Sequence, residues 1–240
     1  MTSVPIAPGA IQLIPVHGIG EVRHGDDVAA TVLAGLAESS LQLVDGDVVV
    51  ITHKIVSKAE GRVADAPQDE DYRALVASEA VQIVRKRGDL VIAVTRHGFI
   101  CANAGVDRSN VADGQVVMLP FDSDASAHRI RLRLERETSA RIAVVVTDTF
   151  GRPWRRGLTD VAIGVSGIDP ILDLRGTMDA HGRILDVTEV AIVDEIAAAA
   201  DLVMGKATGI PVALVRGLDW RPGEGRATDL VRPAAEDMFR

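Results

Sequence analysis

IAVVVTDTFGRPWRRGLTDVAIGVSG, residues 142–167, is the stretch that most strongly predicts the fold of this chain. It opens with the branched apolar residues 142–146, a run typical of a strand that is buried on both faces. Asp148 follows between Thr147 and Thr149, at the carboxyl end of the predicted strand. Because open α/β sheets bind ligands at the carboxyl ends of their strands, these residues predict a ligand site whose oxygen donors suit a hard cation.

The same stretch continues into a region that is rich in arginine. Arg152, Arg155 and Arg156 stand in a glycine-bounded loop around a Pro-Trp pair. Guanidinium groups at this density suit bidentate recognition of phosphate or carboxylate. The plainer interpretation is a solvated basic loop beside Asp160, which would then be a buried carboxylate that caps a turn. The residues alone leave both interpretations open.

Composition narrows the classes of protein to consider. The 240 residues suffice for one large domain or two small ones. No run approaches the roughly 18 apolar residues of a membrane span, and no cationic segment followed by an apolar one opens the chain. We therefore expect a cytoplasmic protein without a membrane partner. The net charge of -8 argues against nucleic-acid binding. The single cysteine, Cys101, excludes an internal disulfide and is expected to be a small buried hydrophobe.

Apolar periodicity and capping residues predict an alternation of strands and helices, and therefore an α/β protein. The predicted strands cover residues 11–16, 48–52, 90–95, 99–102, 116–119, 142–146, 161–165, 171–174 and 212–215, with a further short strand from residue 187. The predicted helices cover residues 27–40, 68–86, 122–138 and 194–204. Residues 90–102 are expected to form a hairpin.

Three segments supply groups suited to phosphate contacts. The turn at residues 17–21 follows the first predicted strand, and its glycines let backbone amides approach a ligand closely. Lys54 and Lys58 follow the strand at residues 48–52. The loop at residues 205–211 is rich in glycine, although no GxxxxGK pattern precedes a helix and a Walker A site is not predicted. The plain structural interpretations are a solvated helix start for the lysines and a helix C-cap for the loop.

A second carboxylate stands in residues 103–110, NAGVDRSN, which have the composition of a binding loop. Asp107 lies in this loop, with Asn110 three residues later. Together with Asp148, Asp107 predicts chemistry on a phosphate that is assisted by a divalent metal ion, which carboxylates and phosphate oxygens would hold.

Five segments of the chain are similar to one family of enzymes. They are residues 45–62, 97–110, 144–167, 187–217 and 232–240, which include the blocks NAGVDRSN and TDTFGRPWR. On these segments the chain resembles the coenzyme F-420-0 gamma-glutamyl ligase family over about residues 11–240. The resemblance implies a single ligase domain over residues 1–240, an α/β fold with mixed sheets of the α+β kind, and an intertwined homodimer.

The resemblance also implies an activity. Members of this family use GTP and a divalent cation, Mg or Mn, to join L-glutamate to the terminal carboxylate of the deazaflavin precursor of coenzyme F-420. They then add further glutamates to the growing gamma-linked tail. A monovalent cation such as K is a further implied cofactor.

Roles are carried over from the family residue by residue. The implied metal ligands are Asp107, Asp148 and Thr149. The implied GTP contacts are Ile19, Gly20, Glu21, Val22, His53, Lys58, Asn110, Met204, Gly205, Lys206, Ala207, Thr208, Gly209, Ile210 and Pro211. The expected catalytic residues are Asp107, Asp148, Arg152 and Arg155, the arginines on the ground of charge alone.

Two positions depart from the family pattern. His53 stands where relatives often carry Ser or Gln. Lys206 stands in a loop where the family places a further metal ligand, a role that an ammonium group cannot fill. Two alternative functions are another divalent-metal-dependent phosphoryl-transfer enzyme on the same fold and a non-catalytic nucleotide-binding module.

Overall fold

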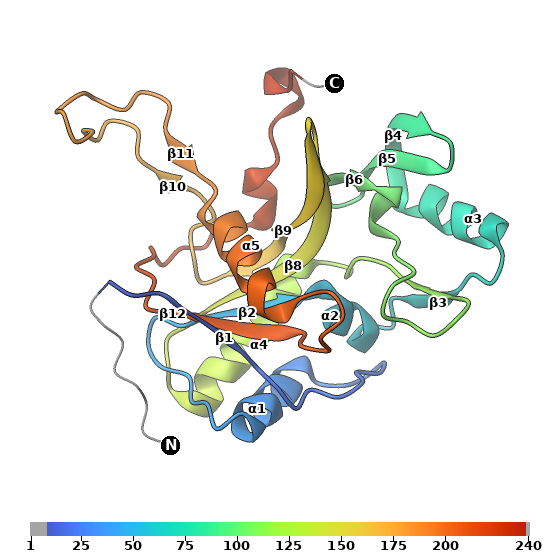
Figure 1. Cartoon of the computed structure of the whole chain (residues 1–240), viewed down its shortest axis with the longest axis horizontal. Helices are drawn as coiled ribbons and strands as arrows, with labels where there is room; N and C mark the ends of the chain where they lie inside the picture. Colours follow the sequence, from blue (N-terminus) through green and yellow to red (C-terminus); the bar gives the residue numbers. More distant parts are fainter. Residues whose placement is uncertain (1–8, 239–240) are drawn as a thin grey trace.

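A five-stranded mixed sheet lies at the centre of the molecule, of which the computed structural model describes residues 9–238 (Figure 1). The ends of the predicted domain, residues 1–8 and 239–240, lie outside the described residues. The strand order is β1 (Gln12–Pro15), β12 (Val212–Arg216), β2 (Val48–Thr52), β8 (Ala143–Arg152) and β9 (Arg155–Ser166). β2 and β8 are parallel, whereas all other neighbours in this sheet are antiparallel. The α/β class with a mixed sheet is confirmed.

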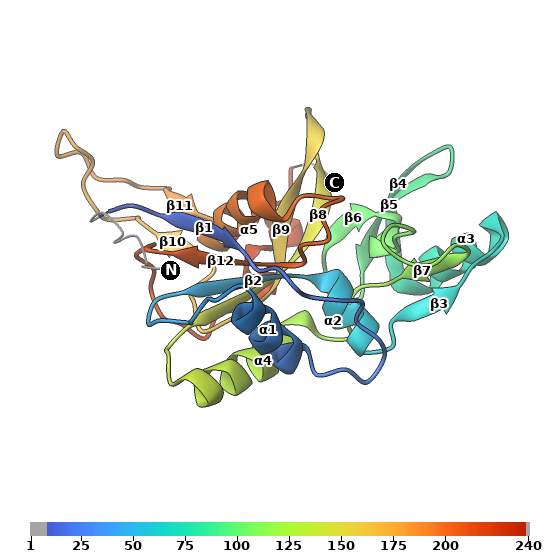
Figure 2. The ribbon, with the colours of Figure 1, turned by 60° about the horizontal axis from the view of Figure 1, so that its bottom comes forward.

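Helices cover both faces of this sheet. Figure 2 shows α1 (Val28–Glu38) and α4 (Ser123–Thr138) on one face and α5 (Ile192–Met204) on the other. Asp27 caps the N-terminus of α1 and Asp122 that of α4, because their side chains accept hydrogen bonds from the Ala30 and Ala125 amides. The main core lies between these layers, and β2 together with the first half of β8 is buried on both faces, as predicted.

A smaller lobe flanks the sheet at the right of Figure 1. It contains α3 (Asp69–Glu79), the meander of β4 (Ala80–Arg87), β5 (Leu90–Thr95) and β6 (Ile100–Ala102), and the pair β3 (Val63–Asp65) and β7 (Gln115–Val117). The predicted hairpin over residues 90–102 is confirmed, since β5 and β6 pair antiparallel. A second apolar cluster, which includes Val76, Ala93 and Val116, forms the core of this lobe.

The predicted helix over residues 68–86 is wrong in its second half. α3 ends at Glu79, and β4 follows at once and pairs with β5. The spacing of Val76, Ala80 and Ile83 fits a helical face, but the hydrogen-bond ladder with β5 holds this segment in an extended conformation. Ile83 is 58% exposed, so a buried helical face does not exist here.

The predicted arginine loop is the outer end of a long β-hairpin. β8 does not stop at Val146 but continues to Arg152, and β9 returns from Arg155. A bulge between Val146 and Thr147 separates the buried inner half of β8 from its outer half. A second projecting arm contains β10 (Leu172–Asp173) and β11 (Glu189–Val190), which pair antiparallel and are shorter than the predicted strands.

Two smaller expectations concern the burial of Cys101 and the absence of a membrane-spanning segment. Cys101 is buried as predicted, and burial raises the pKa of its thiol to about 12, which leaves it protonated and inert at neutral pH. Among residues 9–238, no helix combines the length and the apolar character that crossing a membrane requires.

Candidate functional site

The site is built where β2 ends beside the middle of the parallel strand β8, next to the bulge between the inner and outer halves of β8. Thr52, the last residue of β2, lies opposite Thr147 in β8. α2 (His53–Ala59) begins directly after β2, so His53 and Lys54 lie next to Asp148, the residue that follows Thr147. The sequence places polar side chains here because both strands change from apolar to polar residues at the same level of the sheet.

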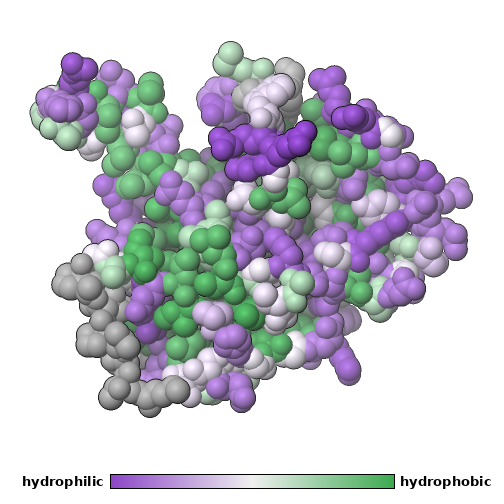
Figure 3. Space-filling model, in the orientation of Figure 1, coloured by the Kyte–Doolittle hydropathy of each residue, from purple (hydrophilic) through white to green (hydrophobic). Residues whose placement is uncertain are grey.

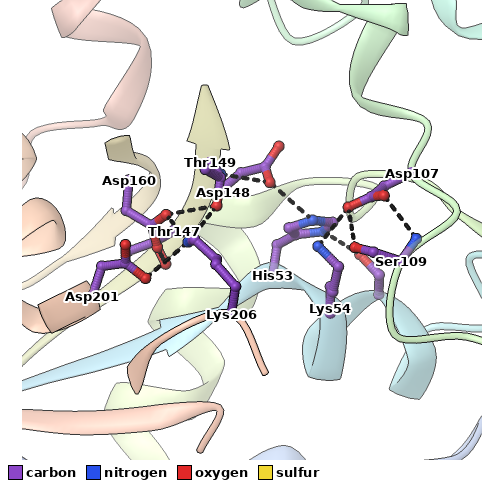
Figure 4. A network of polar contacts seen from close by, with 11 residues as sticks. His53, Lys54, Asp107, Ser109, Thr147, Asp148, Thr149, Asp160, Asp201 and Lys206 are labelled. Atoms are coloured by element: carbon purple, nitrogen blue, oxygen red, sulfur yellow. Dashed lines mark hydrogen bonds and ion pairs between the residues drawn. The ribbon is translucent and has the colours of Figure 1, made fainter. Parts of the chain in front are cut away.

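Six side chains from three segments form the first polar cluster, which Figure 4 shows from its centre to its right side. Nε2 of the buried His53 ring lies 3.2 Å from Oδ1 of Asp148, and its Nδ1 lies 3.1 Å from the Ser57 hydroxyl. Nζ of Lys54 lies 2.8 Å from Oδ2 of Asp107. The Asp107 carboxylate also accepts hydrogen bonds from the amide and the hydroxyl of Ser109.

Both carboxylates of this cluster are ionised at neutral pH. Burial raises the pKa of Asp107, but the Lys54 ammonium and the Ser109 hydrogen bonds outweigh it, so that the net pKa lies below the ordinary value. For Asp148, burial is again outweighed, here by His53, Lys54 and the amide of Thr149, and the pKa is lowered. The Lys54 ammonium therefore stabilises both negative charges before any ligand binds.

The loop that presents Asp107 has an unusual backbone. Asn103, Ala104 and Gly105 have φ values of 50°, 51° and 74°, all in the left-handed region. This conformation costs free energy for the two residues that carry a Cβ atom. A Cβ on Gly105 would lie 2.6 Å from Cγ of Leu119, so only glycine fits there. Asp107 is then fixed by two backbone hydrogen bonds, of 2.9 and 2.8 Å, with Val117.

A second polar cluster surrounds the ammonium group of Lys206, on the left side of Figure 4. Nζ of Lys206 lies 2.6 Å from Oγ1 of Thr149, 2.6 Å from Oδ1 of Asp160 and 2.8 Å from Oδ1 of Asp201. Thr147 and Thr149 both donate hydrogen bonds to the buried Asp160 carboxylate. We call Lys206, Thr149, Asp160 and Asp201 the Lys206 cluster.

A pocket of about 1120 Å³ lies next to both clusters. Its lining combines residues from the turn after β1, from α2, from the loop before β7 and from the loop between α5 and β12. Lys54 belongs to the first polar cluster and also lines this pocket, as do all four members of the Lys206 cluster. Cationic and carboxylate side chains therefore share one concave surface large enough for a ligand the size of a nucleotide.

Most residues that the resemblance assigns to GTP line this pocket. They are Ile19, Gly20, Glu21, Val22, Lys58, Asn110, Met204, Gly205, Lys206, Gly209, Ile210 and Pro211. These residues come from four separate parts of the sequence, and the fold brings them together. Lys58 also links two of these parts, because its ammonium lies 2.6 Å from Oε1 of Glu21.

Other predicted site residues lie elsewhere. His53 is fully buried, and the part of the pocket lining that the structure describes includes neither His53 nor Ala207 nor Thr208. Within the described residues, the lining also includes none of Arg152, Arg155 and Arg156, which are exposed at the outer end of the β8–β9 hairpin. Arg152 donates a hydrogen bond of 3.0 Å to the carbonyl of Arg156.

The described residues fit a divalent cation only in part. Asp107 and Asp148 are ionised oxygen donors of the kind that Mg²⁺ or Mn²⁺ prefers. Thr149 is engaged differently, because its hydroxyl donates to Asp160 and accepts from Lys206. Among residues 9–238, no three His, Cys, Asp or Glu side chains are grouped closely enough to hold a metal ion. Phosphate oxygens or water would have to complete the coordination of a cation at Asp107 and Asp148.

Sequence reasoning missed Asp201, which completes the Lys206 cluster. It lies in the last turn of α5, five residues before Lys206, and reads in sequence as an ordinary surface acid of a helix end. Acid side chains are unfavourable at helix C-termini, where the helix dipole is negative. That local mismatch is the one signal in the sequence that pointed to Asp201.

Comparisons with known proteins agree with the resemblance. A family model described as F420-0:Gamma-glutamyl ligase matches residues 18–217. The coenzyme F420:L-glutamate ligase of Methanothermobacter thermautotrophicus is 41% identical, over 96% of this chain and 99% of the relative. That of Methanocaldococcus jannaschii is 42% identical over 82% and 85%, and that of Methanopyrus kandleri 40% identical over 96% and 98%.

Proposed function

The chain belongs to the F420-0:gamma-glutamyl ligase family, and from this membership we propose that it is a GTP-dependent ligase. Its proposed substrates are GTP, L-glutamate and the deazaflavin precursor of coenzyme F420. It would form an amide bond between the terminal carboxylate of the precursor and the amine of glutamate, and extend the tail through gamma-glutamyl bonds. A divalent cation, Mg or Mn, is its proposed cofactor, with K as a candidate monovalent cation.

One observation carries this proposal. The segments that the family resemblance assigns to GTP are far apart in the sequence, yet twelve of the fifteen residues line one pocket. That pocket contains Lys54, Lys58 and Lys206, whose charges suit a chain of phosphates. The two carboxylates assigned to the metal, Asp107 and Asp148, are not part of the pocket lining but lie close to Lys54, which is.

The chemistry follows from the low reactivity of a carboxylate toward amines. An oxygen of the precursor carboxylate attacks the gamma phosphorus of GTP, the bond to the bridging oxygen breaks, and GDP leaves. The product is an acyl phosphate, in which phosphate is a good leaving group. The glutamate amine then attacks the acyl carbon, phosphate leaves with the transferred oxygen, and the amine loses a proton. This sequence requires no side-chain nucleophile.

The residues of the chain contribute positioning and charge. Lys58 and the backbone amides of residues 19–22 would bind the phosphates, and Thr147 and Thr149 of β8 orient the Asp160 carboxylate through their hydroxyl groups. Asp107 and Asp148 would hold the divalent cation, which supplies positive charge to the transferring phosphoryl group when bound. Charge stabilisation of this kind accounts for much of the rate enhancement in phosphoryl transfer.

Mass spectrometry of the reaction products tests the proposed function. Purified protein is incubated with precursor, L-glutamate, Mg²⁺ and GTP, and we expect the precursor mass to increase by glutamyl units while GDP and phosphate accumulate in equal amounts. Turnover of GTP without a glutamylated product would favour another phosphoryl-transfer enzyme on this fold. Failure to turn over nucleotide at all, with nucleotide still bound, would favour a binding module.

Lys58→Ala is expected to weaken GTP binding more than glutamate binding. The substitution removes one cation from the pocket and leaves the Glu21 carboxylate, its partner at 2.6 Å, without compensation beside the phosphates. We expect the Kd for GTP to increase about tenfold and that for L-glutamate by less than about twofold, as for the loss of one charged hydrogen bond. Isothermal titration calorimetry measures both, with Glu21→Gln as the control that should not weaken GTP binding. Equal losses for the two ligands would refute the assignment.

We also propose a homodimer, as the family resemblance implies. Figure 3 shows apolar residues gathered over α5 and the strands beside it, and Leu202 of α5 is 81% exposed. The nearby β10–β11 arm exposes Met178, Ile184 and Val187. Exposed apolar residues at this density are typical of a protein interface.

Light scattering tests this assembly. The active protein should have twice the chain mass of 25.4 kDa. Leu202→Glu should shift it toward the monomer, whereas the control Leu90→Glu, on the turn of the smaller lobe, should not. A monomeric mass under conditions of full turnover would end the dimer proposal.

A further inference from the structure

The ammonium group of Lys206 has the surroundings of a bound cation. Three oxygens from three different elements lie within 2.6 to 2.8 Å of Nζ: Thr149 from β8, Asp160 from β9 and Asp201 from α5. An ammonium group has three donors, and each has one of these oxygens as its partner. Figure 4 shows the three side chains converging on the end of Lys206 from different sides.

Hydrogen bonds that do not involve Lys206 hold Asp160 at this position. The Asp160 side chain is only 5% exposed and also accepts hydrogen bonds from both threonines of β8. Asp201 is 25% exposed and lies one turn before the end of α5. Two carboxylates held this close together require a cation between them, because their mutual repulsion would otherwise raise the free energy of the folded state.

The loop after α5 positions Lys206 at this site. Gly205 has a φ of 62°, which a residue with a side chain rarely adopts, and it turns the chain back toward the sheet. A Cβ at Gly205 would lie 2.9 Å from Cγ2 of Thr208. The Thr208 hydroxyl in turn donates a hydrogen bond to the carbonyl of Met204, which closes the loop.

The ammonium group of Lys206 lies 2.6 Å from Oδ1 of Asp160 and 2.8 Å from Oδ1 of Asp201, so its charge compensates two carboxylates. Without it, two carboxylates and a hydroxyl would face each other, a set of hard oxygen donors that suits a divalent cation.

We propose that Lys206 is a built-in cation, which fills a site formed by Thr149, Asp160 and Asp201 that would otherwise bind a divalent metal ion. The site lies in the wall of the pocket, so the chain carries a fixed positive charge there. That this charge faces the phosphates of a nucleotide rests on the proposed function. That the Lys206 ammonium occupies the oxygen site does not depend on the proposed function.

Counting bound Mn²⁺ tests this inference. Electron paramagnetic resonance measures free Mn²⁺ in titrations of the protein without nucleotide, and the difference gives the number bound per chain. Lys206→Met removes the charge at similar side-chain length, and Lys206→Gln adds an amide oxygen. We expect each variant to bind one Mn²⁺ per chain more than the parent protein, with the tighter binding in Lys206→Gln because its amide oxygen adds a donor.

Two further variants serve as controls. Lys206→Arg keeps a cation and should bind the same number of Mn²⁺ ions as the parent protein. Adding Asp201→Asn to Lys206→Met removes a ligand and should abolish the additional site. Equal Mn²⁺ binding by the parent protein and by folded Lys206→Met and Lys206→Gln would overturn the inference.

The parent protein also provides a test that does not require replacement of Lys206. Asp201→Asn alone should leave its Mn²⁺ count unchanged if an ammonium fills the site. A decrease by one ion per chain would show that a metal ion occupies it, and would overturn the inference even if the lysine variants do not fold.

These outcomes are separate from the outcome for the proposed function. If the parent protein forms no glutamylated product, the ligase proposal fails while the Mn²⁺ counts still decide whether Lys206 fills the oxygen site. If it is an active ligase and Asp201→Asn lowers the Mn²⁺ count, the ligase proposal stands and the built-in cation does not.

Discussion

Replacing Asp148 by Asn is expected to lower kcat for ligation by about 10²-fold or more, the size of loss that follows removal of one electrostatic element from an active site. The substitution removes a negative charge without changing the volume of the side chain. Asp148 keeps an ionised carboxylate at the end of a buried strand segment, since its pKa is lowered despite burial. A divalent cation bound there would lose one charged ligand.

Steady-state kinetics and circular dichroism check this result together. The far-ultraviolet spectrum should be unchanged, because an Asn oxygen can still accept the hydrogen bond from the Thr149 amide. Asp89→Asn is the matched control, since the Asp89 side chain is 91% exposed on the smaller lobe and should leave kcat unchanged. An unchanged rate for Asp148→Asn at saturating Mn²⁺ would remove Asp148 from the proposed metal site.

The second large effect concerns stability rather than catalysis. Arg216→Met is expected to lower the free energy of unfolding by about 3 to 5 kcal/mol, the cost of leaving a buried charge without its partner. The Asp47 side chain is fully buried, and its oxygens lie 2.7 and 2.6 Å from Nε and Nη2 of Arg216. This pair fixes the turn before β2 to the end of β12, and therefore the strand that leads into the site.

Urea unfolding measures this loss. Arg175→Met is the control, because Arg175 pairs with Asp173 where both side chains are about half exposed, and its replacement should be indistinguishable from the parent protein. Adding Asp47→Asn to Arg216→Met removes the unpaired buried charge of Asp47 and should recover part of the free energy of unfolding. A loss in Arg216→Met no greater than in the control would show that the buried pair contributes little.

The parts of the fold that the sequence predicts well are those that local patterns determine. β2 begins and ends at the predicted residues 48 and 52, because a run of branched apolar residues is bounded by an Asp-Gly turn and a polar helix start. α4 also begins and ends as predicted, because Asp122 caps it and its apolar spacing continues to Thr138. In these segments, local preference and tertiary packing favour the same structure.

The errors arise where tertiary pairing decides between two allowed conformations. Residues 80–87 contain apolar residues at spacings that suit a helix or a strand, and only the pairing with β5 selects the strand. The outer half of the β8–β9 hairpin contains glycine, proline and arginine, which are typical of a loop. The ladder from Thr147 to Arg152 nevertheless holds it as two paired strands.

The site shows the same division. The motifs around Asp107 and Asp148 predict two carboxylates that lie close to Lys54, and glycines and lysines near strand ends predict three segments whose residues line one pocket. No such pattern predicts the Lys206 cluster, because Asp160, Asp201 and Thr149 are far apart or unremarkable in the sequence. Only the folded hairpin and the end of α5 bring their oxygens within 2.8 Å of one ammonium group.

Oxygen-18 transfer tests the central claim, activation of the precursor carboxylate by GTP, most directly. The precursor is labelled with ¹⁸O at its terminal carboxylate and incubated with the protein, GTP, Mg²⁺ and L-glutamate. Mass spectrometry then compares the label in phosphate with the amount of amide formed. We predict that each amide bond formed delivers one ¹⁸O atom to phosphate, because the attacking carboxylate oxygen leaves with the phosphoryl group. Unlabelled phosphate released alongside glutamylated product would contradict this account, and so would the absence of that product.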